Sequence, residues 1–178
     1  MLPFLSGSPD SLFGNPSSSH RYGTKARQVV EDARSQVASL LYCQAGEEIL
    51  FTGCGSESNN YAIKGLFEAQ DKQGGGVITR RNHIVTSQTE HPSVMEVCKF
   101  LERERSCRVT YLNVDREGFV DLDQLKQCLC PETLLVTIMH ANNETGTLQP
   151  IEQIGQILDE YEQRNGTPRI YLHCDASQ

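Results

Sequence analysis

The run Thr133-Leu-Leu-Val-Thr-Ile-Met139 is almost continuously apolar and rich in branched side chains. Such a run predicts a strand buried on both faces, because a strand with one face in water alternates apolar and polar residues. The polar segment His140-Ala-Asn-Asn-Glu-Thr-Gly146 follows it directly. A helix is expected next, over 150–163, with Pro150 at its start, where proline is tolerated. The run is therefore one strand of an α/β protein.

Strands and helices alternate on both sides of this run. Further strands are expected over 48–52, 83–87, 107–112 and 169–174. Helices are expected over 25–42 (capped by Thr24), 57–70, 91–104 and 121–129 (capped by Asp121), where apolar residues recur at helical spacing. Alternation of this kind with continuous apolar strands predicts a mostly parallel sheet with helices on both faces.

Length and composition limit the classes of protein to which the chain can belong. Its 178 residues correspond to about one domain, and its 16 basic and 23 acidic side chains give a net charge of −7. That balance argues against direct nucleic-acid binding, which needs a basic surface. No apolar stretch approaches the ~18 residues of a membrane span, and residues 1–7 do not resemble a secretory signal.

The seven cysteines are odd in number and follow no disulfide framework. They predict reduced thiols and a reducing compartment, cytoplasmic or organellar. Only Cys128 and Cys130 lie close together in the sequence, and no second pair completes a metal site around them. We therefore expect no metal.

Ligands of parallel α/β sheets bind at the carboxyl ends of the strands, so the residues after each strand are the informative ones. The first such segment is Gly53-Cys-Gly-Ser-Glu-Ser-Asn-Asn60. Its glycines allow a close backbone approach, and its serines and the following helix amides can donate hydrogen bonds to a phosphate. A serine-capped helix is the alternative interpretation. The segment lacks the endings of a P-loop and of a dinucleotide fingerprint.

Three further strands end in polar side chains. His91 can act as an acid or base or stack on a ring, although a histidine there can also be a capping or surface residue. Asn142 and Asn143 can bind a ring hydroxyl or form an ordinary turn. Asp175 needs a cationic partner if it is buried, unless it caps a helix. A phosphate site, a histidine, amides and an acid together match the ligands of pyridoxal 5′-phosphate (PLP).

The order of these segments resembles the cysteine desulfurase family, with selenocysteine lyase as a close relative, within the class V aminotransferase fold. The matching runs are Phe13–Gly23, Ile49–Asn60, Thr86–His91, Met139–Gly146 and His173–Gln178. The resemblance implies part of the large PLP-binding domain of an aspartate aminotransferase-like fold over 13–178. Residues 1–12 are then a loop or a non-native leader, and the rest of the large domain and the small domain are missing.

The resemblance also implies cofactor ligands, namely Gly55, Ser56, His91, Asn143, Asp175 and Gln178. Gly55 and Ser56 would bind the phosphate, and His91 would stack on the pyridine ring and take part in proton transfer. Asn143 and Gln178 would contact the phenolic oxygen, and Asp175 would hold the pyridinium nitrogen. Gly53 and Cys54 depart from the commoner Ser and Gly, which weakens the phosphate assignment. Cys54 and Cys174 are interpreted as packing thiols.

The implied reaction removes sulfur from L-cysteine, giving L-alanine and an enzyme persulfide that serves iron–sulfur cluster assembly or tRNA thiolation. The family's Schiff-base lysine follows the Asp-x-x-Gln segment, and its persulfide cysteine lies later still. None of the five lysines fits that role. The chain is therefore expected to be an interior fragment of a PLP-dependent enzyme, inactive alone.

Two alternatives stay open. The chain could belong to a selenocysteine lyase that acts on L-selenocysteine, as the lengthened segment 161–170 suggests, whereas 101–104 and 109–112 favour a desulfurase. It could also be a non-catalytic short form that binds the cofactor or a partner. Family members are homodimers that hand sulfur to a scaffold or acceptor protein. The resemblance predicts those partners and no membrane.

Overall fold

The structure is a computed structural model that describes residues 12–44, 46–73 and 81–178. Nearly all of the expected leader over 1–12 lies outside the described residues. The chain divides into two compact units, residues 1–51 and 52–178. No described helix is both long and apolar enough to cross a membrane.

The N-terminal unit contains helix α1 (Arg21–Leu40) and the short 3-10 helix η2 (Gly46–Glu48). The helix begins earlier than expected, because His20 and not Thr24 is its cap. The Nδ1 atom of His20 accepts a hydrogen bond from the Gly23 amide at 3.2 Å. The prediction of a Thr24 cap is wrong, since Thr24 lies inside the first turn and its hydroxyl donates to the His20 carbonyl instead.

The strand expected over 48–52 is absent. Residues 49–52 form no strand, and no described strand pairs with them. The Ile49 carbonyl accepts a hydrogen bond from the Arg34 guanidinium, which also stacks over the Phe51 ring at 5.0 Å. A short apolar run becomes a strand only where a neighbour satisfies its backbone. Side-chain contacts with α1 replace that neighbour here.

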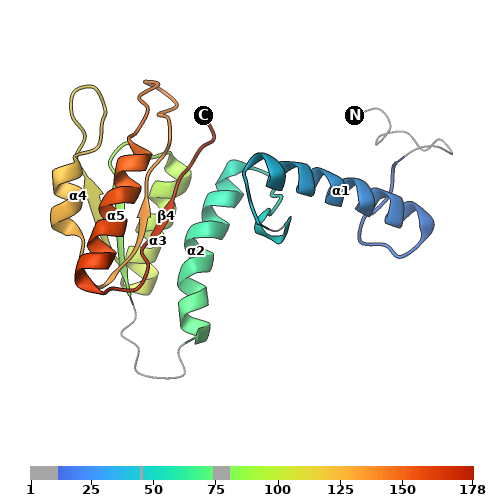
Figure 1. The fold of residues 1–178 in the computed structure, drawn as a ribbon, viewed down its shortest axis with the longest axis horizontal. Coiled ribbons are helices and arrows are strands. Elements are labelled where there is room, and N and C mark those ends of the chain that lie inside the picture. The colour runs from blue at the N-terminus through green and yellow to red at the C-terminus, as the bar shows by residue number, and fades with distance from the viewer. Residues whose placement is uncertain (1–11, 45, 74–80) are drawn as a thin grey trace. The chain divides into compact units, whose positions relative to one another are not determined.

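The C-terminal unit is built on a four-stranded parallel sheet in the order β2-β1-β3-β4 (Figure 1). Its strands are β1 (His83–Ser87), β2 (Arg108–Leu112), β3 (Thr133–Thr137) and β4 (Tyr171–His173). Every residue of β1 and β3 is buried. The predicted parallel sheet with doubly buried central strands is confirmed.

Helices cover both faces of this sheet, as predicted. Helices α2 (Gly55–Gln73) and α3 (Pro92–Arg105) pack on one face, and α4 (Leu122–Cys128) and α5 (Ile151–Asn165) on the other. Neighbouring residues of β1 separate the two cores, because successive strand side chains point to opposite faces. Ile84 packs with α2 and α3, and Val85 packs with α4 and α5. Element boundaries lie within a few residues of those expected.

The strand order places a crevice at a defined point. From β1 the chain moves outward to β2, and then returns past β1 to β3. The loops that leave the carboxyl ends of β1 and β3 therefore diverge to opposite faces of the sheet. Open α/β sheets bind their ligands at such a switch point.

Candidate functional site

Hydrogen bonds fasten together the loops that leave β1, β3 and β4. The Met139 amide donates to Glu90 Oε1 at 2.9 Å, and Asn142 Nδ2 donates to the Thr89 carbonyl at 3.2 Å. On the other side of β3, the His140 amide donates to the Asp175 carbonyl at 2.8 Å. The three loops thus form one continuous floor at the carboxyl edge of the sheet.

A cavity of about 300 Å³ opens on this floor, at the lower end of the roughly 300–1,000 Å³ that small-molecule sites occupy. All of the predicted ligand residues line it, namely Gly55, Ser56, His91, Asn143, Asp175 and Gln178. Asn59, Ser93 and Ser177 also line it. Residues far apart in the sequence therefore line one cavity at the carboxyl ends of the strands.

The N-terminus of α2 forms one wall of the cavity. The helix begins at Gly55, where an added Cβ would stand only 3.3 Å from Ser177 Oγ, so glycine keeps the backbone accessible. The hydroxyl of Ser58 is not available to a ligand, because it pairs with Thr52 Oγ1 at 2.6 Å. The hydroxyl of Ser56 has no partner among the described residues. Of the two serines, Ser56 is the one free to meet an anion at this helix end.

Asp175 lies two residues beyond β4 and is held by donors on both oxygens. Its Oδ2 accepts from Asn59 Nδ2 at 2.8 Å, and its Oδ1 accepts from Ser177 Oγ at 2.6 Å. Although burial by itself raises the pKa of Asp175, these hydrogen bonds outweigh it and hold that pKa below its ordinary value. A negative charge therefore faces the cavity.

His91 combines two of the interpretations that the sequence left open. It is the N-cap of α3, where its Nδ1 accepts from the Ser93 amide at 3.1 Å. Its ring is exposed and also lines the cavity. Within the described part of the chain, its Nε2 has no hydrogen-bond partner. Capping thus fixes one edge of the ring and leaves the other available.

The sequence left two interpretations for Asn142 and Asn143, an ordinary turn or a ligand of a ring hydroxyl. Asn142 forms the turn, and Asn143 lies where a ligand would. Asn142 Oδ1 accepts from the amides of Glu144 and Thr145, each at 2.9 Å, which makes an ordinary asparagine turn. The turn leaves Asn143 lining the cavity. Its amide makes no hydrogen bond to any other described residue.

Two buried polar residues beside the cavity escaped the sequence analysis. Asn59 is only 4% exposed, and it follows Gly55 by four residues, which places both on one helix face. That spacing was the available signal. Glu90 is buried beneath the floor, where its Oε1 accepts from Ser87 and Met139. Burial raises the pKa of Glu90 to about 7. No pattern in the sequence around Glu90 indicated that it would be buried.

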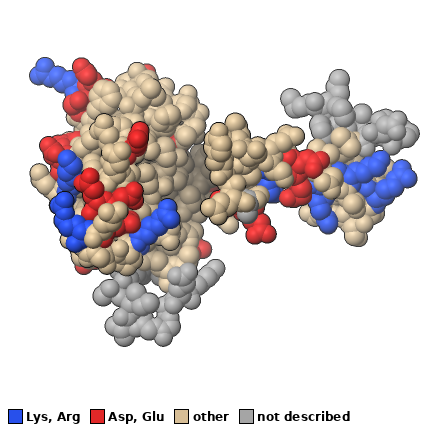
Figure 2. Space-filling model, in the orientation of Figure 1, with Lys and Arg blue, Asp and Glu red and all other residues tan. Residues whose placement is uncertain are grey.

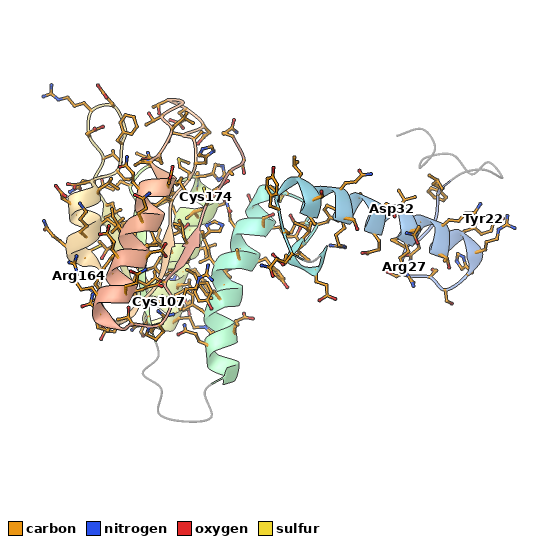
Figure 3. All side chains as sticks on the ribbon, viewed as in Figure 1. Tyr22, Arg27, Asp32, Cys107, Arg164 and Cys174 are labelled. Atoms are coloured by element: carbon orange, nitrogen blue, oxygen red, sulfur yellow. The ribbon has the colours of Figure 1, made fainter. Side chains whose placement is uncertain are left out.

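The thiols near the cavity differ from each other. Cys174 is partly buried beyond β4, and burial raises its pKa. Cys54 is exposed on the cavity wall, so its interpretation as a packing thiol is wrong. Figure 3 shows Cys174 and Cys107 at opposite ends of the sheet. None of the seven cysteines forms a disulfide in the described part of the chain.

Charge around the C-terminal unit is mixed. In Figure 2 its lysines and arginines lie beside aspartates and glutamates, and no broad basic area covers the visible face. No lysine is among the residues that line the cavity. Lys64 stacks over the Phe100 ring at 4.5 Å, and Lys99 pairs with Glu96.

Comparisons with known proteins agree with this geometry. A family profile described as aminotransferase class V matches residues 10–178. The cysteine desulfurase IscS of Dictyoglomus turgidum is 46% identical over the whole chain. The chain spans about 40% of the length of that relative.

Solved structures give the same result. A NifS-like protein matches with a TM-score of 0.81 at 36% identity, over 94% of this chain and 42% of the other. A structure of SspA in complex with cysteine also has a TM-score of 0.81, at 37% identity over 99% and 46% of the two chains.

Proposed function

Because the chain belongs to the aminotransferase class-V family, we propose that its strand-end cavity binds PLP, as the cofactor-binding part of a cysteine desulfurase. One observation carries the proposal. A single cavity brings together a helix N-terminus with a free serine hydroxyl, an anionic carboxylate and the exposed ring of a histidine. A phosphate, a protonated ring nitrogen and an aromatic face are the groups that these three features would bind.

The chemistry of the cavity fits this cofactor. The carboxylate of Asp175 stays charged and lies part-exposed at the end of β4, where a pyridinium N–H would be its missing cation. Gly55 leaves no side chain between the first amides of α2 and the cavity. When bound, PLP supplies an electron-poor ring that stabilises negative charge developing on an attached amino acid.

Each lining residue then has a specific task. Gly55 and Ser56 bind the phosphate through the backbone and the hydroxyl. Asp175 holds the proton on the ring nitrogen. The ring of His91 covers one face of the pyridine, and the amides of Asn143 and Gln178 donate to the phenolic oxygen. Asp175 already accepts from Asn59 and Ser177 and has further lone pairs for the ring nitrogen. The hydroxyl of Ser56 and the side-chain amide of Asn143 make no hydrogen bond to any other described residue.

We further propose that the substrate is L-cysteine. Support comes from the relatives named cysteine desulfurase and from the structure of SspA in complex with cysteine. The reaction breaks the carbon–sulfur bond of L-cysteine. The sulfur passes to an enzyme thiol as a persulfide, and the carbon takes a proton to give L-alanine. The persulfide would then serve an acceptor protein in iron–sulfur cluster assembly or tRNA thiolation.

Two steps of that reaction need groups other than the lining residues. A lysine must bind the cofactor covalently, and a mobile cysteine must receive the sulfur. Among the described residues no lysine lines the cavity, and Cys54, directly before α2, is the one thiol that does. We therefore expect these 178 residues to bind PLP reversibly and to form no alanine from L-cysteine. Sodium borohydride, which fixes PLP to a lysine that holds it, would then leave no stoichiometric adduct by mass spectrometry.

Titration of the chain with PLP, followed by the absorbance of the cofactor, tests the proposal. Saturable binding is expected, and Asp175→Ala should weaken it at least tenfold, because a charged hydrogen bond is worth about 1.5–3 kcal/mol. Asp123→Ala, at an exposed aspartate on α4, is the matched control and should bind like the parent. Absence of saturable binding, or equal loss in both variants, would reject the proposal.

The same proposal includes a reducing compartment and a homodimeric assembly. The seven cysteines form no disulfide among the described residues, which favours a reducing compartment. Family membership supports a homodimer. Analytical ultracentrifugation of the chain tests the second point, and a strictly monomeric chain at all concentrations would contradict it.

A further inference from the structure

Four polar side chains beside the cavity form one continuous hydrogen-bonded path. Asn59 Nδ2 lies 2.8 Å from Asp175 Oδ2 and 2.9 Å from Ser93 Oγ. Ser93 Oγ in turn lies 2.8 Å from His91 Nδ1. The path joins the loop after β4, helix α2, the start of α3 and the loop after β1. It therefore connects the acid of the site to its histidine.

Counting donors and acceptors fixes the direction of every bond. The carboxylate of Asp175 can only accept, so the nitrogen of the Asn59 amide must face it. The same nitrogen has a second hydrogen, which it donates to Ser93 Oγ. The hydroxyl of Ser93 accepts there, and its single hydrogen is free to be donated onward.

The onward bond determines the tautomer of His91. Its Nδ1 faces two donors, the Ser93 hydroxyl at 2.8 Å and the Ser93 amide at 3.1 Å. A ring nitrogen between two donors must be the unprotonated one. The neutral ring therefore carries its proton on Nε2, the atom with no partner in the described part of the chain.

Burial makes this path difficult to replace. Asn59 is 4% exposed, so little water can take the place of its amide. The other titratable groups around Asp175 are His173 on β4, Cys174 beside it and Glu90 after β1. His173 lowers the pKa of Asp175, whereas Asp175 helps to raise the pKa values of Cys174 and Glu90. Among the described side chains of α2, Asn59 alone hydrogen-bonds to the carboxylate.

We propose that Asn59 and Ser93 are positioning residues, which keep Asp175 charged and aimed at the cavity and hold His91 with its proton on Nε2. The proposal rests on the proposed function, because Asp175 and His91, which the two residues position, are cofactor ligands only if that function is correct. In the bound state, Asp175 would accept from the ring nitrogen while His91 offers an N–H donor and never a free base on Nε2.

Nuclear magnetic resonance of the chain without cofactor tests the path directly. Correlations between ring protons and nitrogens report the tautomer of His91, assigned with His91→Gln, and carboxyl carbon shifts report the titration of Asp175. The parent chain should show the Nε2–H tautomer. Asn59→Ala should raise the pKa of Asp175 and shift the ring nitrogens of His91.

Two matched variants make the test specific. Asn60→Ala removes the neighbouring amide, whose bond goes to the Ser56 carbonyl, and should leave both signals unchanged. Ser93→Ala deletes one hydroxyl while keeping the backbone cap, so it serves even if Asn59→Ala does not fold. It should shift His91 without raising the pKa of Asp175 as far as Asn59→Ala does, and Ser93→Thr should restore the parent spectrum.

The outcomes separate this proposal from the proposed function. A proton on Nδ1 in the parent chain, or unchanged Asp175 and His91 signals in Asn59→Ala, would overturn the positioning role. PLP affinity is measured afterwards and should fall roughly tenfold in Asn59→Ala. Failure of the parent chain to bind PLP would reject the cofactor assignment, while the tautomer and the titration would still decide whether the path exists.

Discussion

Ser56 and Ser58 lie two residues apart at the start of α2, yet only one of them can serve a ligand. The hydroxyl of Ser58 is taken by Thr52, whereas that of Ser56 lines the cavity without a protein partner. Sequence alone treats the two as equivalent members of a phosphate-binding turn. Packing of residue 52 against the helix start distinguishes them.

This difference predicts that Ser56→Ala and Ser58→Ala will affect PLP affinity differently. Ser56→Ala should weaken PLP binding roughly tenfold, since it removes a hydrogen bond to a charged phosphate. Ser58→Ala should leave affinity within about twofold and lower thermal stability slightly. Titration with pyridoxal, which has no phosphate, provides the control, because Ser56→Ala should not alter its affinity. An equal loss for pyridoxal would show that Ser56 does not meet the phosphate.

At the scale of elements, the carboxyl ends of β1 and β3 are joined by a buried carboxyl group. Glu90 Oε1 accepts from Ser87 at 2.7 Å and from the Met139 amide at 2.9 Å, while no described group meets its Oε2. Burial raises the pKa of Glu90 to about 7 from an ordinary 4.5. The folded chain therefore keeps this proton at pH values where the unfolded chain has lost it.

The buried carboxyl group of Glu90 predicts that the stability of the fold depends on pH. Because the folded-state pKa is raised, the stabilising contribution is complete below pH 4.5 and is lost as the pH rises through 7. The loss corresponds to roughly 3 kcal/mol. Glu90→Gln keeps the accepting oxygen and removes the titration, so the difference in free energy of unfolding between the two proteins should change across that window.

Urea denaturation of both proteins at a series of pH values measures this difference. The comparison is needed because His83 acts in the opposite direction. Burial and the nearby Arg108 lower the pKa of His83 to about 4, so its stabilising contribution is lost as the pH falls from 6.5 through that value. His83 is present in both proteins and cancels. A constant difference from pH 4 to pH 8 would show that folding does not raise the pKa of Glu90.

The elements also show what could be predicted from the sequence. Strands β1 and β3 are continuous apolar runs because both of their faces are covered, and that pattern is unambiguous. The run at 48–52 looks similar, but whether it becomes a strand depends on a neighbour that no local pattern encodes. Gly55 and Ser56 begin α2, which follows no described strand. His91, Asn143 and Asp175 were predictable as strand-end residues. Asn59 was not, because its role depends on how α2 packs against the other loops.

At the scale of the whole molecule, residues 52–178 contain both hydrophobic cores and the entire cavity. No described residue of the N-terminal unit belongs to either core cluster. The apolar area that stabilises the sheet is therefore contained within one unit, which favours independent folding of that unit.

A chain restricted to residues 52–178 should accordingly unfold cooperatively and bind PLP within about threefold of the affinity of the 178-residue chain. Circular dichroism during thermal unfolding and PLP titration check the two parts of this prediction. Non-cooperative melting would contradict the first. Loss of binding with cooperative melting retained would show that the N-terminal unit contributes to the site.

The proposed function requires PLP to bind at the carboxyl ends of the parallel strands. Backbone amide shifts of the isotopically labelled 178-residue chain, recorded during PLP titration, test it most directly. We expect saturable changes concentrated in residues 54–59, 91–93, 139–143 and 175–178, with the amides of α4 and α5 unaffected. Changes centred on any other part of the chain, or none at all, would contradict it.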